Sequence, residues 1–102
     1  MHAAQRKRLE AAGWRIGSAE EFLGLTKEEA ALIEMKLALA EKVKALRVKH
    51  RISQATLAAR IGSSQSRVAK IEAGDPSVSL DLLVRAALAA GGSKREVANA
   101  LG

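Results

Sequence analysis

Four hydrogen-bonding side chains gather within six residues of the chain: Gln65, Ser66, Arg67 and Lys70. The same stretch offers only Val68 and Ile71 as apolar core positions, so a helix formed there would carry the polar groups on its outer faces. An α-helix fits the major groove of B-DNA, where glutamine matches the donor and acceptor of adenine and lysine matches the acceptors of guanine. Arg67 could contact a base or a phosphate. These residue types indicate recognition of double-stranded DNA.

Other kinds of chemistry have little support in the sequence. His2 and His50 are far apart and the chain has no cysteine, so we expect neither a metal site nor a disulfide. The serines at positions 63, 64 and 66 fall in a turn and a helix cap, where serine is common, and nothing resembles a pairing of nucleophile and base. We therefore expect no catalysis and no cofactor.

Two short helices separated by a glycine turn account for residues 53–74. Ser53 is a good N-cap for a first helix that reaches residue 59 or 60, and Gly62 ends it. The inward positions of this helix are Leu57, Ala58 and Ile61. Ser64 caps the second helix, which should run to about Ala73 and is followed by Gly74. The second helix is the one that carries the four polar side chains.

A long helix over about 27–50 should position this pair, with Thr26 and Glu29 as its capping box. One apolar stripe runs its length: Leu32, Met35, Leu39, Val43 and Leu46. A second apolar face, formed by Ile33, Leu37 and Ala40, is confined to the first half. The first half is therefore expected to be covered on two sides, either by residues 14–25 folding back or by a partner protein.

Four further helices complete the expected fold. Two short ones are expected over residues 3–12 and about 18–24. Ser79 caps a helix that contains Leu80, Leu83, Val84, Ala87 and Leu88 and stops at glycines 91 and 92. A last helix, with Val97 and Leu101, begins at a capping box formed by Ser93 and Glu96. The prediction is an all-α fold, in which Trp14 and Phe22 are the only aromatic residues.

Charge is distributed unevenly along the 102 residues, whose net charge is +6. Residues 1–17 carry +3, residues 18–35 carry −4, residues 36–70 carry +8 and residues 71–102 carry −1. A basic central segment in a neutral to acidic background is typical of nucleic-acid binding, although a solvated charged face would give the same pattern. Arg51, close to Ser53, is expected to contact the phosphate backbone. No apolar run is long enough to cross a bilayer and no signal peptide opens the chain.

The segments ISQATLAARIG and SSQSRVAKIEAG resemble the helix-turn-helix of the Xre family, which includes the phage Cro and cI repressors, over roughly residues 36–90. The resemblance implies a five-helix, lambda-repressor-like DNA-binding domain, here preceded by a helical extension. It assigns base reading to Gln65, Ser66 and Lys70, and phosphate contacts to Gln54, Ser64 and Arg67. It also implies a buried ion pair between Arg47 and Glu72. A single recognition helix makes few contacts, so a dimer on two half-sites is expected.

The extension GWRIGSAEEFLGLTKEEAALIEMKLALA, joined to this domain, is similar to antitoxins of the host-inhibition-of-growth type. That resemblance implies a homodimer that binds its own operator and neutralises a small RNA-cleaving toxin encoded beside it. Without a membrane-spanning run or a signal peptide, the protein is expected in the cytoplasm, in a prokaryote and associated with the nucleoid. A stand-alone or phage-type regulator without a toxin is the alternative. A protein-interaction module that no longer binds DNA is a third, from a different class.

The chain is accordingly divided into an N-terminal extension, residues 1–35, for toxin binding or packing, and a DNA-binding domain, residues 36–102. The apolar residues of the extension that could contact a toxin are Trp14, Ile16, Phe22 and Leu23. For the two aromatic residues, packing inside the protein is the preferred interpretation. The dimer contact is expected on the last two helices, at Leu88, Val97 and Leu101. No membrane partner is expected.

Overall fold

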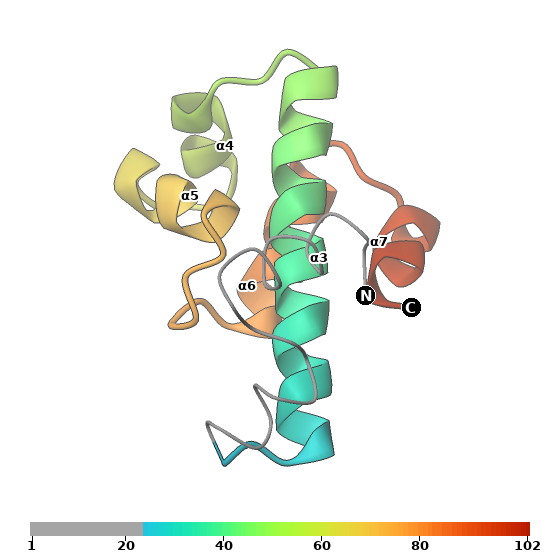
Figure 1. The fold of residues 1–102 in the computed structure, drawn as a ribbon. Coiled ribbons are helices and arrows are strands. Elements are labelled where there is room, and N and C mark those ends of the chain that lie inside the picture. Colours follow the sequence, from blue (N-terminus) through green and yellow to red (C-terminus); the bar gives the residue numbers. More distant parts are fainter. Residues whose placement is uncertain (1–23) are drawn as a thin grey trace.

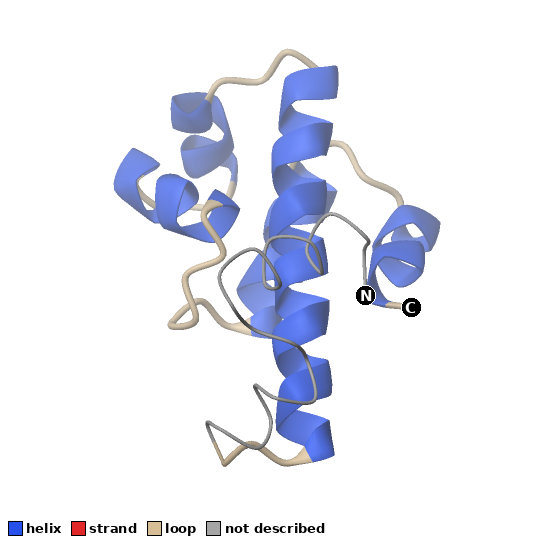
Figure 2. Cartoon of the chain, viewed as in Figure 1, coloured by secondary structure: helices blue, strands red, loops and turns tan. Residues whose placement is uncertain are grey.

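The computed structural model describes residues 24–102, and every regular element in this part of the chain is an α-helix (Figures 1 and 2). The five helices are α3 (Lys27–Lys49), α4 (Gln54–Arg60), α5 (Gln65–Glu72), α6 (Leu80–Ala89) and α7 (Lys94–Leu101). The predicted all-α fold is confirmed. The helices expected over 3–12 and about 18–24 fall outside the described residues, apart from Gly24, which lies in a turn. None of the described helices is long and apolar enough to cross a membrane.

Helix α3 is the central element, and α5, α6 and α7 pack against it (Figure 1). It begins at the predicted capping box, in which the Glu29 amide donates to the Thr26 hydroxyl at 3.0 Å and the Thr26 amide donates to the Glu29 carboxylate at 3.2 Å. Its inner side chains Leu39, Val43 and Leu46 are buried and join a single core with residues of the other four helices. The second half of α3 is therefore the scaffold on which the short helices are mounted.

The first half of α3 carries apolar side chains that the rest of the described chain leaves exposed. Leu32 and Ile33 are 44% and 41% exposed, so no described part of the chain encloses them. The cover was expected from residues 14–25, of which 14–23 lie outside the described residues, or from a partner protein. The helix is continuous through residues 35 and 36, where the extension was expected to meet the DNA-binding domain.

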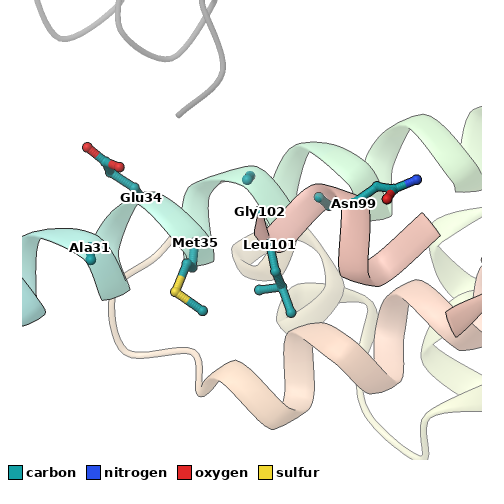
Figure 3. A pocket seen from close by; sticks show the side chains of 8 residues that line it. Ala31, Glu34, Met35, Asn99, Leu101 and Gly102 are labelled. Atoms are coloured by element: carbon teal, nitrogen blue, oxygen red, sulfur yellow. The ribbon is translucent and has the colours of Figure 1, made fainter. Parts of the chain in front are cut away.

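A groove of about 330 Å³ lies between the first half of α3 and the end of α7. It is lined by Ala31, Glu34, Met35, Ala38, Asn99, Ala100, Leu101 and Gly102. The side chains of Met35 and Leu101 point into the space between the helices, whereas the Glu34 carboxylate points the other way (Figure 3). The groove is therefore lined by both apolar and polar groups, and the Glu34 carboxylate does not face into it.

Helices α4 and α5 form the predicted pair, and each begins at its predicted serine. The Ser53 hydroxyl accepts from the Thr56 amide at 3.0 Å, and the Ser64 hydroxyl accepts from the Arg67 amide at 3.1 Å. The inward positions Leu57, Ala58, Ile61, Val68 and Ile71 are all buried, as expected. These buried side chains fix the rotation of α5 about its own axis and hence the choice of residues that face outward.

The turn between α4 and α5 depends on Gly62, whose φ is +65°. The amides of Gly62 and Ser63 donate to Ala59 O and Ala58 O at 3.3 and 2.8 Å, which closes the last turn of α4 in a Schellman motif. A left-handed residue at this point is what turns the chain from one helix into the next.

Replacing Gly62 by alanine is expected to lower the free energy of unfolding by about 1–2 kcal/mol, the cost of a Cβ in the left-handed region. Space is not the reason, because a Cβ built at Gly62 meets no atom within 4 Å. Gly62→Asn should lose less, since asparagine tolerates this conformation better than other residues. Urea unfolding followed by circular dichroism measures both, and an equal loss for the two variants would contradict this explanation.

Helices α6 and α7 begin at Ser79 and at the Ser93–Glu96 capping box, as predicted. The apolar residues expected at a dimer contact differ in exposure. Val97, expected at a dimer contact, is only 6% exposed and belongs to the core, so it has almost no surface to offer a partner. Leu88, also expected at a dimer contact, is 41% exposed. Leu101 is half-buried at the groove.

Candidate nucleic-acid interface

Helix α5 has one buried side and one exposed side. Val68 and Ile71 are fully buried. The remaining positions of its first six residues are all exposed: Gln65, Ser66, Arg67, Ala69 and Lys70. Helical periodicity accounts for the division, because Val68 and Ile71 are three residues apart and share one face. The structure therefore brings together the four polar residues singled out in the sequence, on one exposed helix.

An ion pair ties the end of α5 to α3. Arg47 Nε donates to Glu72 Oε2 at 2.5 Å, and Arg47 Nη2 donates to Glu72 Oε1 at 3.0 Å. The two side chains are only 15% and 5% exposed. The hydrogen bond to Glu72 raises the pKa of the Arg47 guanidinium above its usual value, against the opposing effect of burial. The contact is bidentate, so it constrains how α5 lies against α3.

The same ion pair reaches α4 and the loop before it. Gln54 Nε2, in the first residue of α4, donates to Glu72 Oε1 at 3.3 Å. Arg47 Nη1 donates to the backbone oxygen of Ile52 at 3.0 Å. Glu72 therefore accepts from side chains of α3 and α4, and a single carboxylate joins the three helices of the candidate interface.

The basic segment, residues 36–70, divides into two groups in the structure. Four of its side chains are engaged within the protein: Lys36 with Pro76 O, Lys42 with Glu96, Arg47 with Glu72, and Arg60 with Ala89 O. The other five are exposed: Lys44, Lys49, Arg51, Arg67 and Lys70. The structural use of Lys36 and Arg60 had no sequence signal, because their carbonyl partners lie 40 and 29 residues away.

Arg51 lies between α3 and α4 in an unusual backbone conformation. Its φ of +56° is the only positive value among the non-glycine residues from 24 to 102. Its side chain is exposed, three residues before Gln54. It is therefore available to a ligand at the N-terminal end of α4, as are Ser64 and Arg67 at the corresponding end of α5.

The loop after α5 places a carboxylate beyond the C-terminal end of that helix. Asp75 accepts from the Ser77 hydroxyl at 2.7 Å and from the Ser77 amide at 2.8 Å. These two hydrogen bonds are the main reason that the pKa of Asp75 lies below its ordinary value. An ionised carboxylate at this end repels phosphate, so the N-terminal end of α5 is the end suited to an anionic ligand.

Two short helices are joined by a glycine turn, and the second is anchored in the core with its polar groups facing outward. This arrangement defines a helix-turn-helix DNA-binding domain. A family model described as Helix-turn-helix (HTH_3) matches residues 43–97, and the chain belongs to this Xre-type family. The protein is thus a DNA-binding transcriptional regulator. Neither the search of curated proteins nor that of solved structures gave a match. Within the described helices and loops, no group of three or more His, Asp or Glu could hold a metal ion.

Proposed function

We propose that the protein is a sequence-specific repressor that inserts α5 into the major groove of its operator. The exposed polar face of α5 is the observation that carries this proposal. Gln65, Ser66 and Lys70 would read base edges, with glutamine suited to adenine and lysine to guanine. The phosphate contacts would come from the N-terminal ends of the two short helices and the loop before them: Arg51, Gln54, Ser64 and Arg67.

The repressor is proposed to act as a homodimer. One helix of eight residues makes too few base contacts to select a site in a genome, whereas two copies on half-sites about 34–36 Å apart square the specificity. Leu88, exposed on α6, is the first candidate for the contact between copies. Leu101, half-buried on α7, is the second. Val97 is only 6% exposed and offers little surface to such a contact.

The finer proposal is that this repressor is the autoregulating antitoxin of a type II toxin–antitoxin module. It rests on the resemblance of residues 13–40 to host-inhibition-of-growth antitoxins and on the separation of two surfaces. The first half of α3 lies outside the matched region and projects away from α4 and α5 (Figure 1). It combines exposed Leu32 and Ile33 with the acidic residues Glu28, Glu29 and Glu34. Apolar anchors with an acidic rim suit a basic RNA-cleaving toxin.

Two alternatives are separated from this proposal by simple observations. A stand-alone repressor would have no small toxin gene beside its own. A protein-interaction module that does not use DNA would show no steep dependence of nucleic-acid affinity on salt, whereas phosphate contacts by basic residues make that dependence steep. The exposed polar face of α5 favours DNA over a protein partner at this position.

Substitutions on α5 test the base-reading proposal. Gln65→Ala is expected to lose about 1–3 kcal/mol on an operator selected from random duplexes, with little loss on random DNA, because a base contact carries sequence preference. Arg67→Ala should weaken binding to both kinds of DNA and make the salt dependence shallower, because a phosphate contact is independent of sequence. Fluorescence anisotropy at several salt concentrations measures both effects. Equal losses for Gln65→Ala on the two kinds of DNA would show that α5 does not read bases as proposed.

A further inference from the structure

The outward face of α5 contains an apolar residue among its polar ones. Ala69 is exposed, four residues after Gln65, three after Ser66 and next to Lys70. At 100° per residue, it lies well away from the buried Val68 and Ile71 and within the sector that holds Gln65 and Ser66. A helix that enters the major groove with these polar residues brings the Ala69 methyl group to the base edges with them.

The major groove presents one apolar group, the C5 methyl of thymine, and alanine is among the side chains that contact it. We propose that Ala69 reads a thymine through this methyl group, so that α5 combines hydrogen-bonded readout with one apolar contact. The inference rests on the proposed function, in which α5 faces the bases. It adds to that function a specificity-determining residue that carries no hydrogen-bonding group.

The position of Ala69 also places its thymine within the half-site. Four residues of α-helix advance about 6 Å, and successive base pairs are about 3.4 Å apart. The thymine should therefore lie within about two base-pair steps of the base that Gln65 contacts. Because 5-methylcytosine carries the same methyl group at the same place, it should be a better substitute for this thymine than cytosine is.

A purely steric role for Ala69 is the competing explanation. A small residue lets the helix approach the bases closely, and in that case any bulkier side chain weakens binding without preference for thymine. The two explanations differ when the DNA, rather than the protein, loses its methyl group. Removing that group leaves the steric fit of the helix intact but removes the apolar contact.

The experiment uses the full chain and an operator selected from random duplexes, in which each thymine is replaced singly by deoxyuridine. Loss of one buried methyl contact should lower affinity about fourfold at one position in each half-site. Ala69→Gly should lower affinity for the thymine duplex by a similar factor and should no longer distinguish thymine from deoxyuridine there. Gln65→Ala is the matched control, because it should keep the distinction at that position.

A weakened fold does not imitate this result, since it lowers affinity for both duplexes equally. Ala69→Ser, which retains a helix-compatible side chain, should also no longer distinguish thymine from deoxyuridine. The proposal is overturned if no deoxyuridine substitution lowers affinity, or if Ala69→Gly keeps the distinction. Should the selected operator still depend on Gln65 in that case, the proposed function stands and only this inference fails. A selection that enriches no sequence would overturn both.

Discussion

Replacing Arg47 by alanine is expected to lower the free energy of unfolding by about 3–5 kcal/mol, because it leaves a buried charge without its partner. Glu72, the side chain left behind, is only 5% exposed, and its remaining partner is Gln54 at 3.3 Å. Glu72→Ala should cost somewhat less, since the 15% exposed Arg47 keeps its hydrogen bond to Ile52 O and can reach water. Urea unfolding of the three proteins measures the difference.

The control for this prediction replaces both charges by apolar residues of similar size, Arg47→Met with Glu72→Leu. Such a double variant buries no charge and should lose much less than Arg47→Ala. Its α5 would nevertheless lack the bidentate bond that orients it, so operator affinity is the second quantity to measure. If both single alanine variants shift the unfolding midpoint negligibly, the ion pair does not hold α3 and α5 together.

The second large effect is expected at the first half of α3. If a toxin is encoded beside this protein, Leu32→Ser with Ile33→Ser should abolish co-purification with it, because each apolar anchor that becomes buried on binding contributes about 1.5–3 kcal/mol. The fold and the operator affinity should remain unchanged, since both side chains are exposed and lie outside the region matched to the helix-turn-helix family. Co-expression followed by affinity purification tests toxin binding, and anisotropy tests the operator.

Val48→Ser is the matched control. Val48 is also an exposed apolar residue of α3, at 59%, but it lies at the opposite end of the helix. It should keep the toxin. Point substitutions are preferable to a truncation near Lys36, which would remove the first nine residues of α3 together with its capping box. Full-strength toxin binding by the double variant would exclude this surface, and the absence of any adjacent toxin would leave the plain repressor.

The positions of the helices could be predicted because their signals are local. Thr26, Ser53, Ser64, Ser79 and Ser93 each cap the helix that the sequence assigns to them. Whether each apolar side chain is buried or exposed could not be predicted in the same way. Periodicity marks Leu32, Leu88 and Val97 as apolar positions alike, but only the packing of distant segments decides that Val97 is buried and the other two are exposed.

The candidate site shows the same division. The outward positions of α5 follow from the helical period, because its two buried apolar residues fix which side of the eight-residue helix faces the core. The Arg47–Glu72 pair came only from the family resemblance, since a separation of 25 residues has no local signature. The residue type of Ala69 gives no indication of base reading, because its side chain has no hydrogen-bonding group. Arg60 and Lys36 belong to the basic segment by sequence, but each donates a hydrogen bond to a backbone carbonyl oxygen of a distant loop or helix end.

Helix α3 has no break between its exposed first half and the part that holds Arg47. The 14 residues from Ile33 to Arg47 form unbroken helix that advances about 21 Å. A protein bound to the first half of α3 would therefore lie at a fixed distance and in a fixed direction from the DNA, unlike one attached through a flexible linker. In a symmetric dimer on an operator, the spacing of the half-sites would then determine the distance between the two proteins bound to the two copies of α3.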